Sequence, residues 1–181
     1  MTFTETPLRG SFIVELQPFS DDRGWFARYY CKDEFKQIGH NKEWMQLNHS
    51  VTYEKGAIRG MHYQNAPFKE VKLVRCIAGA VFDAVIDLRR DSVTFLKWFG
   101  IELSAENKTM LYIAEGFAHG FQCLTDDCEL LYHHTESYMP VAEAGIRYND
   151  PKIGIQWPLP LTTLSSRDAN HPLLDENFKG I

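Results

Sequence analysis

The sequence lacks the features that would place it among membrane, secreted or nucleic-acid-binding proteins. Its 181 residues carry a formal net charge of −5, which argues against a nucleic-acid-binding surface that depends on positive charge. No apolar run reaches the length that spans a bilayer. The first residues, MTFTETPLRG, lack the basic and apolar regions of a signal peptide. We therefore expect a soluble, cytoplasmic protein with neither nucleic acid nor membrane as a partner.

Cysteine is scarce and follows no motif. The four cysteines are Cys31, Cys76, Cys123 and Cys128. They form no C-x-x-C pair and match no zinc-binding spacing, so we expect reduced, mostly buried thiols as in cytosolic proteins. Repeats, low-complexity tracts and Pro- or Gly-rich linkers are also missing. With 44% hydrophobic residues, the chain is predicted to form a single globular domain over residues 1–181.

Alternation of apolar and polar residues with a period of two is the dominant pattern. In VFDAVIDL, Phe82, Ala84, Ile86 and Leu88 share one face of a predicted strand. The preceding segment VKLVRCI alternates similarly, and Gly79–Ala80 between the two predicts a tight hairpin. Further strands are predicted in WFGIEL, TMLYIA, GFQCL and ELLYHHT.

Helical patterns are almost absent. Only KDEFKQI predicts an interior helix, which Asp33 would cap and Gly39 would end. Many short strands with regular turns predict an all-β sandwich, jelly roll or small barrel. Such a fold encloses a cavity, so polar residues on inward strand faces become candidates for a site. The final LLDENFKGI carries no pattern that predicts a role.

The segment QLNHS places Gln46, Asn48 and Ser50 on one face of a predicted strand, opposite Leu47 and Val51. Alternation alone favours a solvated outer face for the three polar residues. The alternative is that they form a polar wall of a ligand cavity.

His62 lies in the middle of the predicted strand RGMHYQ. It is a metal ligand, a core histidine or a base for proton transfer. His62, Gln64, Glu70 and His119 follow the ligand order of metal-binding cupins, but Gln64 stands where the second histidine belongs. An amide oxygen is a poor ligand for zinc or iron compared with imidazole. The ligand count therefore falls short of a metal site.

Other polar residues interrupt apolar strands. Asp83 is either a surface residue or an inward partner that fixes the tautomer of a histidine. An inward Lys72 would be costly unless it meets an anion or an electron-rich oxygen. His133 and His134 are adjacent on one strand, so they point to opposite faces and do not chelate one ion.

Eight segments occur in the order found in one family of sugar-nucleotide enzymes. They are DDRGWFARYYCKDEF, QLNHS, IRGMHYQ, KLVRCIAGAVFDAVIDLR, GIELSAEN, IAEGFAHGF, GIRYNDPKIGIQWP and LSSRDANHP. Together they closely resemble the dTDP-4-dehydrorhamnose 3,5-epimerase family over nearly the whole chain. Each motif alone is weak evidence for the family, whereas all eight in the same order along the chain are specific evidence for it.

The resemblance implies a cupin-type β jelly roll with a few short peripheral helices. It implies a homodimer that uses no metal and no cofactor. The implied substrate is a nucleotide-linked 4-keto-6-deoxy sugar, which would be epimerised at C3, at C5 or at both. The implied pathways are dTDP-rhamnose and other deoxysugar synthesis for surface polysaccharides such as lipopolysaccharide.

Roles are carried over by matching positions. The resemblance implies that His62 is the base, that Asp168 is its paired carboxylate, that Tyr132 is the proton donor and that Lys72 lies near the keto oxygen. The implied substrate-binding residues are Arg23 (expected from the partner subunit), Arg28, Gln46, Asn48, Arg59, His119, Tyr138, Glu143 and Arg167.

These residue types suit the implied chemistry. A proton next to a ketone is weakly acidic, and histidine is a base poised near neutral pH. A buried Asp168 would orient His62 and stabilise its cation. Lys72 would stabilise the enolate oxygen. Inversion needs a second acid on the opposite face of the sugar, for which Tyr132 is the candidate.

Two positions depart from the family pattern. Arg28 stands where many members have glutamate near the nucleotide, which leaves the preferred base open. Arg167 stands where lysine is common, which changes hydrogen-bond geometry but keeps the charge. Three alternatives therefore remain open: an epimerase for one carbon or for a CDP-linked sugar, a metal-dependent cupin enzyme, and a non-catalytic sugar-nucleotide-binding module.

Overall fold

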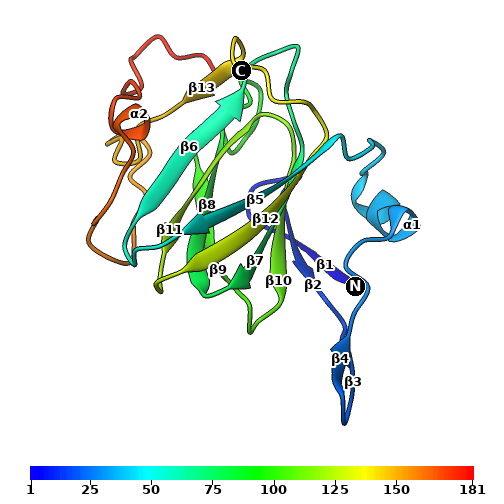
Figure 1. The fold of residues 1–181 in the computed structure, drawn as a ribbon. Helices are drawn as coiled ribbons and strands as arrows, with labels where there is room; N and C mark the ends of the chain where they lie inside the picture. Colours follow the sequence, from blue (N-terminus) through cyan, green and yellow to red (C-terminus); the bar gives the residue numbers. More distant parts are fainter.

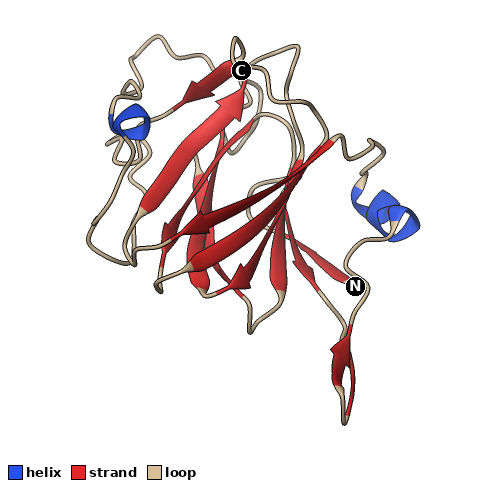
Figure 2. Ribbon diagram, viewed as in Figure 1, coloured by secondary structure: helices blue, strands red, loops and turns tan.

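The computed structural model describes residues 1–181, and strands make up most of its regular structure (Figure 2). The strands are β1 (Thr2–Glu5), β2 (Phe12–Glu15), β3 (Phe19–Asp21), β4 (Gly24–Phe26), β5 (Gln46–Thr52), β6 (Ile58–Gln64), β7 (Lys72–Ala78), β8 (Ala80–Asp87), β9 (Trp98–Ser104), β10 (Thr109–Ile113), β11 (Phe117–Cys123), β12 (Cys128–His134) and β13 (Glu143–Gly145). The helices are α1 (Lys32–Phe35), the 3-10 turn η1 (Lys36–Ile38) and α2 (Ser166–Ala169).

Two antiparallel sheets pack face to face (Figure 1). One has the strand order β1-β2-β10-β7-β12-β5 and the other has the order β13-β6-β11-β8-β9. Alternate residues of facing strands fill the space between them, among them Val74, Val81, Val85, Leu103 and Leu130, all fully buried. Burying each such side chain stabilises the fold by about 2 kcal/mol. The predicted jelly roll with short peripheral helices is confirmed.

The outer faces of both sheets are partly covered. Phe35 of α1 is fully buried against Leu73 and Met110 on the outside of the six-stranded sheet. The chain after β13 covers the outside of the five-stranded sheet, where Ile153 and Ile181 join a second apolar cluster. The C-terminal segment, in which no sequence pattern predicts a role, therefore packs on the sandwich.

The hairpin predicted at Gly79–Ala80 is wrong, although both flanking strands exist. β7 pairs with β10 and β12, whereas β8 pairs with β9 and β11 in the other sheet. Gly79, at φ +70°, forms the corner between the sheets. Alternation identifies a strand but not its pairing partner. The strands on either side of a corner alternate with the same period as the two strands of a hairpin, so the pattern does not distinguish the two cases.

The predicted helix exists, but it starts differently. Cys31 rather than Asp33 is the N-cap, and it makes no side-chain capping bond. Asp33 lies in the first turn, where its charge favours the helix N-terminus. Gly39 ends the following 3-10 turn in the left-handed conformation, as predicted.

The short β3–β4 hairpin projects away from the sandwich near the N-terminus (Figure 1). The hairpin has no recognisable sequence pattern because each strand has only three residues. The four cysteines are free and three are buried, as predicted. No helix in the structure combines the length and apolar character needed to cross a bilayer.

Candidate active site

Strands from both sheets line a set of hollows that meet at His62. Three hollows of about 270, 220 and 280 Å³ all include this residue in their walls. The antiparallel registers bring the walls together: His119 of β11 lies opposite His62 of β6, and Tyr132 of β12 lies opposite Asn48 of β5.

The polar face of β5 lines these hollows. Gln46 and Asn48 lie in one hollow, and Asn48 and Ser50 lie in the next. The three polar residues therefore form a cavity wall, as the alternative interpretation of QLNHS predicts, and Asn48 in that wall is also exposed to solvent. Leu47 and Val51 point outward and are exposed.

His62 is paired with Asp168, which comes from the far end of the chain. The Nε2 of His62 lies 2.7 Å from Oδ1 of Asp168. The backbone N–H of Gly60 donates to the other carboxylate oxygen at 3.2 Å. Ser165 caps α2 by accepting the backbone N–H of Asp168, which fixes the helix that carries the carboxylate. Burial by itself would raise the pKa of Asp168, but the bonds from His62 and Gly60 lower it overall.

His119 forms a second histidine–carboxylate pair. Its Nε2 lies 2.9 Å from Oδ2 of the fully buried Asp83. The inward alternative for Asp83 is therefore confirmed. The ring of His119 also lies 6.3 Å, centroid to centroid, from that of Tyr132, in an edge-on arrangement.

The Tyr132 hydroxyl lies on the β12 wall of the pocket. It shares a hydrogen bond of 2.9 Å with Ser50. Burial raises the pKa of Tyr132, so its hydroxyl keeps the proton at neutral pH.

Lys72 meets an anion, as its inward position requires. Its Nζ lies 3.1 Å from Oε1 of Glu70, and Nδ1 of His134 lies 2.8 Å from the other oxygen. Burial by itself would raise the pKa of Glu70, but the contacts with His134 and Lys72 lower it to about 2. Glu70 and His134 were not among the predicted site residues, although both line this hollow. The sequence pointed to them only indirectly: His134 shares a strand face with Tyr132, and Glu70 occurs in the cupin-like ligand order.

The four residues in the cupin ligand order do not gather around one point. His62 and His119 pair with different aspartates, and Glu70 pairs with His134. Gln64 donates to the Phe68 carbonyl at 3.0 Å. The group that does bring three ligand atoms within 4.8 Å of one another is His62, Asp168 and His171.

A chain of polar contacts borders the pocket. The Tyr138 hydroxyl donates to Glu143 at 2.8 Å, and Arg167 donates to the other oxygen of Glu143 at 2.8 Å. Gln46 accepts the backbone N–H of Tyr138 at 3.1 Å. Arg59 donates to the Thr52 hydroxyl at 2.8 Å. Arg59 and Arg167 both line the hollow that contains Tyr132, and they give it positive charge.

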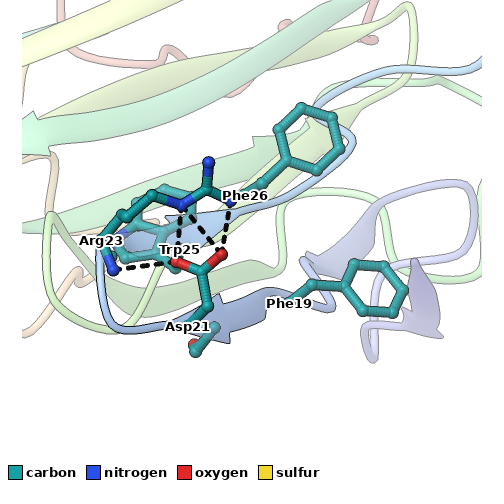
Figure 3. Close-up of a pocket in the computed structure, with 7 residues that line it drawn as sticks. Phe19, Asp21, Arg23, Trp25 and Phe26 are labelled. Atoms are coloured by element: carbon teal, nitrogen blue, oxygen red, sulfur yellow. Dashed lines mark hydrogen bonds and ion pairs between the residues drawn. The ribbon is translucent and has the colours of Figure 1, made fainter.

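Arg23 and Arg28 do not line this pocket within one chain. Arg23 lies on the β3–β4 hairpin and donates through Nε to Asp21 at 3.1 Å (Figure 3). A separate hollow of about 480 Å³ is lined only by the hairpin, including Phe19, Trp25 and Phe26. Arg28 donates to Glu34 at 2.7 Å. Of the predicted site residues, these two alone lie apart from the group around His62.

Comparisons with known proteins agree with this geometry. The model of the dTDP-4-dehydrorhamnose 3,5-epimerase family matches residues 5–176. The chain is 44% identical over 178 residues to the dTDP-4-dehydrorhamnose 3,5-epimerase of Salmonella typhimurium, covering 97% of each chain.

Solved structures of the same kind superpose closely. The crystal structure of dTDP-4-dehydrorhamnose 3,5-epimerase from Elizabethkingia anophelis has a TM-score of 0.94 at 36% identity, with 98% of each chain covered. The Bacillus anthracis enzyme, crystallised with TDP and PPi bound, has a TM-score of 0.92 at 37% identity, covering 96% of this chain and 99% of that one.

Proposed function

Because the chain belongs to the dTDP-4-dehydrorhamnose 3,5-epimerase family, we propose that it inverts C3 and C5 of a dTDP-linked 4-keto-6-deoxy sugar. It is a carbohydrate epimerase, an enzyme of the isomerase class. One observation carries the proposal. The paired His62 and Asp168, 2.7 Å apart, border a pocket that also contains the Tyr132 hydroxyl.

His62 removes the proton next to the ketone. A neutral imidazole that donates its Nε2–H to Asp168 keeps a lone pair on Nδ1, and that lone pair accepts the proton from carbon. Asp168 then stabilises the imidazolium that forms. The low exposure of Asp168, 2%, strengthens this interaction because little water screens it.

Proton removal places negative charge on the C4 oxygen. Lys72 lies in the same pocket wall as His134, and Glu70 holds both at fixed positions. An ammonium held in advance near the developing enolate lowers the barrier without reorganisation of solvent. His119, aligned by Asp83, supports the same oxygen.

Tyr132 returns the proton from the other side of the sugar. Tyr132 belongs to the six-stranded sheet, and His62 belongs to the five-stranded sheet. A sugar between the two sheets therefore has the base on one face and the phenol on the other. The raised pKa of Tyr132 supports this role because the hydroxyl stays protonated at neutral pH.

The border of the pocket suits the nucleoside diphosphate. Arg59 and Arg167 offer guanidinium donors for phosphate oxygens. Gln46 and Asn48 offer amides, and Tyr138 offers a half-exposed ring for stacking on a base or sugar. Glu143 fixes the positions of Tyr138 and Arg167.

A second subunit completes the site in this proposal. The projecting hairpin exposes Phe19, Trp25 and Phe26, with 77%, 50% and 73% of their surfaces accessible. Aromatic residues exposed together on one projection are typical of an interface. The hairpin of the partner would bring Arg23 to the diphosphate, and Arg28 would come with it. Light scattering should give a dimer mass for the wild type and a lower mass for a Trp25→Ser, Phe26→Ser variant.

The cellular setting is also a proposal. Four free cysteines suit a reducing cytoplasm, and the net charge of −5 gives no reason to expect nucleic acid as a partner. The product would enter deoxysugar synthesis for surface polysaccharides, including lipopolysaccharide.

The decisive test follows solvent deuterium into the sugar. EDTA-treated protein is incubated with dTDP-4-keto-6-deoxyglucose in D₂O, and the sugar protons are followed by NMR. Deuterium at both C3 and C5 with inversion supports the proposal. Uptake at one carbon would make the chain a single-centre epimerase. No uptake would overturn the proposal for this nucleotide, and the CDP-linked sugar would then be tested in the same way.

A further inference from the structure

His62, Asp168 and His171 form a cluster of three metal-ligating side chains. Oδ1 of Asp168 lies between the two rings, 2.7 Å from Nε2 of His62 and 3.6 Å from Nε2 of His171. The rings of the two histidines meet edge to face, with centroids 5.6 Å apart. All three ligand atoms lie within 4.8 Å of one another.

His171 has no part in the proposed reaction, and its ring nitrogen has no partner. Nε2 is buried and makes no hydrogen bond. A buried polar nitrogen without a partner typically costs about 1–3 kcal/mol. A ligand bound at Nε2 would give this buried nitrogen the partner that it lacks.

The backbone and its neighbours hold His171 in this position. Its carbonyl accepts from Nε of Arg147 at 2.9 Å. The ring lies directly over Gly145 of β13, where a Cβ would collide with it. Asp168, three residues earlier, is fixed by the cap of α2. His171 and Asp168 are therefore held close together before any ligand arrives, which reduces the entropy lost on binding.

We infer that His62, Asp168 and His171 bind a zinc ion that inhibits the enzyme. Two imidazoles and one carboxylate are a ligand set that zinc prefers, with a fourth position left for water. Ligands about 2.0–2.2 Å from the metal lie farther apart than His62 and Asp168 do now, so the pair has to open slightly. The exposed Arg167, whose Nε lies 3.7 Å from Asp168, opposes a second cation.

Inhibition follows from the tautomer of His62, and this step depends on the proposed function. Zinc takes the lone pair of Nε2, so the ring proton moves to Nδ1. Nδ1 then has no lone pair for the proton on carbon. The site differs from the cupin ligand order, because Gln64, Glu70 and His119 take no part in it.

Binding is measured first, without substrate. Metal-stripped protein is titrated with ZnCl₂ by calorimetry for the wild type, His171→Asn, His171→Leu and His49→Asn. His49 is the matched control, because it pairs with Glu129 at 2.9 Å outside the cluster. We expect Kd to rise at least about tenfold in both His171 variants, since even second-shell changes cost that much. His49→Asn should bind like the wild type. Circular dichroism checks that each variant is folded.

Activity is measured second, as the zinc concentration that halves each variant's own zinc-free rate. That concentration should rise in parallel with Kd in the His171 variants, and EDTA should restore the wild-type rate. Magnesium, which prefers oxygen ligands, should not inhibit. Folded His171 variants that bind zinc as tightly as the wild type would overturn the inference, as would absence of saturable binding. Because binding is read without substrate, failure of the proposed epimerase activity would be recognised separately.

Discussion

The Nε2 of His62 lies 2.7 Å from Oδ1 of Asp168, although 106 positions separate the two residues in the chain. The contact joins the middle of β6 to α2, a helix of only four residues. The same carboxylate also accepts the backbone N–H of Gly60 at 3.2 Å. One aspartate therefore aligns the histidine and ties the C-terminal segment to the strand that carries it.

Asp168→Asn should lower kcat by about 10²–10⁴-fold, because the amide cannot stabilise the imidazolium of His62. His62→Ala should lower kcat at least as much. Residues that act as a unit are not additive, so the double variant should be no slower than His62→Ala. The rate of epimer formation by NMR tests this. Independent, multiplying losses would contradict a shared role.

Tyr132→Phe should separate proton removal from inversion. His62 still removes the proton, but the acid on the opposite face is lost. In D₂O the substrate should take up deuterium with its configuration retained, while the inverted product forms about 10²–10⁴-fold more slowly. Ser50→Ala serves as a control, because it removes only the partner of the hydroxyl. Inversion at the wild-type rate in Tyr132→Phe would exclude Tyr132 as the donor.

Glu70→Gln should destabilise the fold by about 3 kcal/mol, because it leaves the Lys72 ammonium buried without an anion. The side chains of Glu70 and Lys72 are only 10% and 9% exposed. Asp33→Asn is the matched control: it breaks the exposed pair with Lys36 and removes a charge from the first turn of α1, so a loss of at most about 1 kcal/mol is expected. Urea unfolding gives both values. Equal midpoints for the two variants would show that burial does not strengthen the Glu70–Lys72 pair.

Asp87 should make stability depend on acid pH. Burial by itself would raise its pKa, but bonds from Arg89, Ser92 and Thr94 lower it from 3.8 to about 2. The folded state therefore favours the carboxylate, which contributes about 2 kcal/mol above pH 4. This contribution is lost as the pH falls from about 4 through about 2. The difference in unfolding free energy between the wild type and Asp87→Asn should shrink over that window. A constant difference would contradict the prediction.

Much of the fold was predictable because burial imposes a period of two on strands. The face that contains Ala84 and Ile86 and the face that contains Val81 and Val85 are both buried, in separate clusters. Pairing was not predictable, as the corner at Gly79 shows. Short strands such as β3 and β13 were not predicted, because three residues are too few to show an alternating pattern.

The sequence by itself determined which side chains share a strand face. Strand geometry places Gln46, Asn48 and Ser50 on one face and sets Asp83 opposite Ala84 and Ile86, but it does not decide which face points inward. The motifs also identified the family, because their order along the chain carries that information.

Only the tertiary structure decided which groups meet. It paired Glu70 with Lys72 and His134, brought His171 to Asp168, and placed Arg23 on a hairpin away from the pocket. These contacts join residues from different strands, helices and loops. A local pattern records which side of its own strand a residue occupies, whereas the packing of the two sheets determines what lies opposite that side.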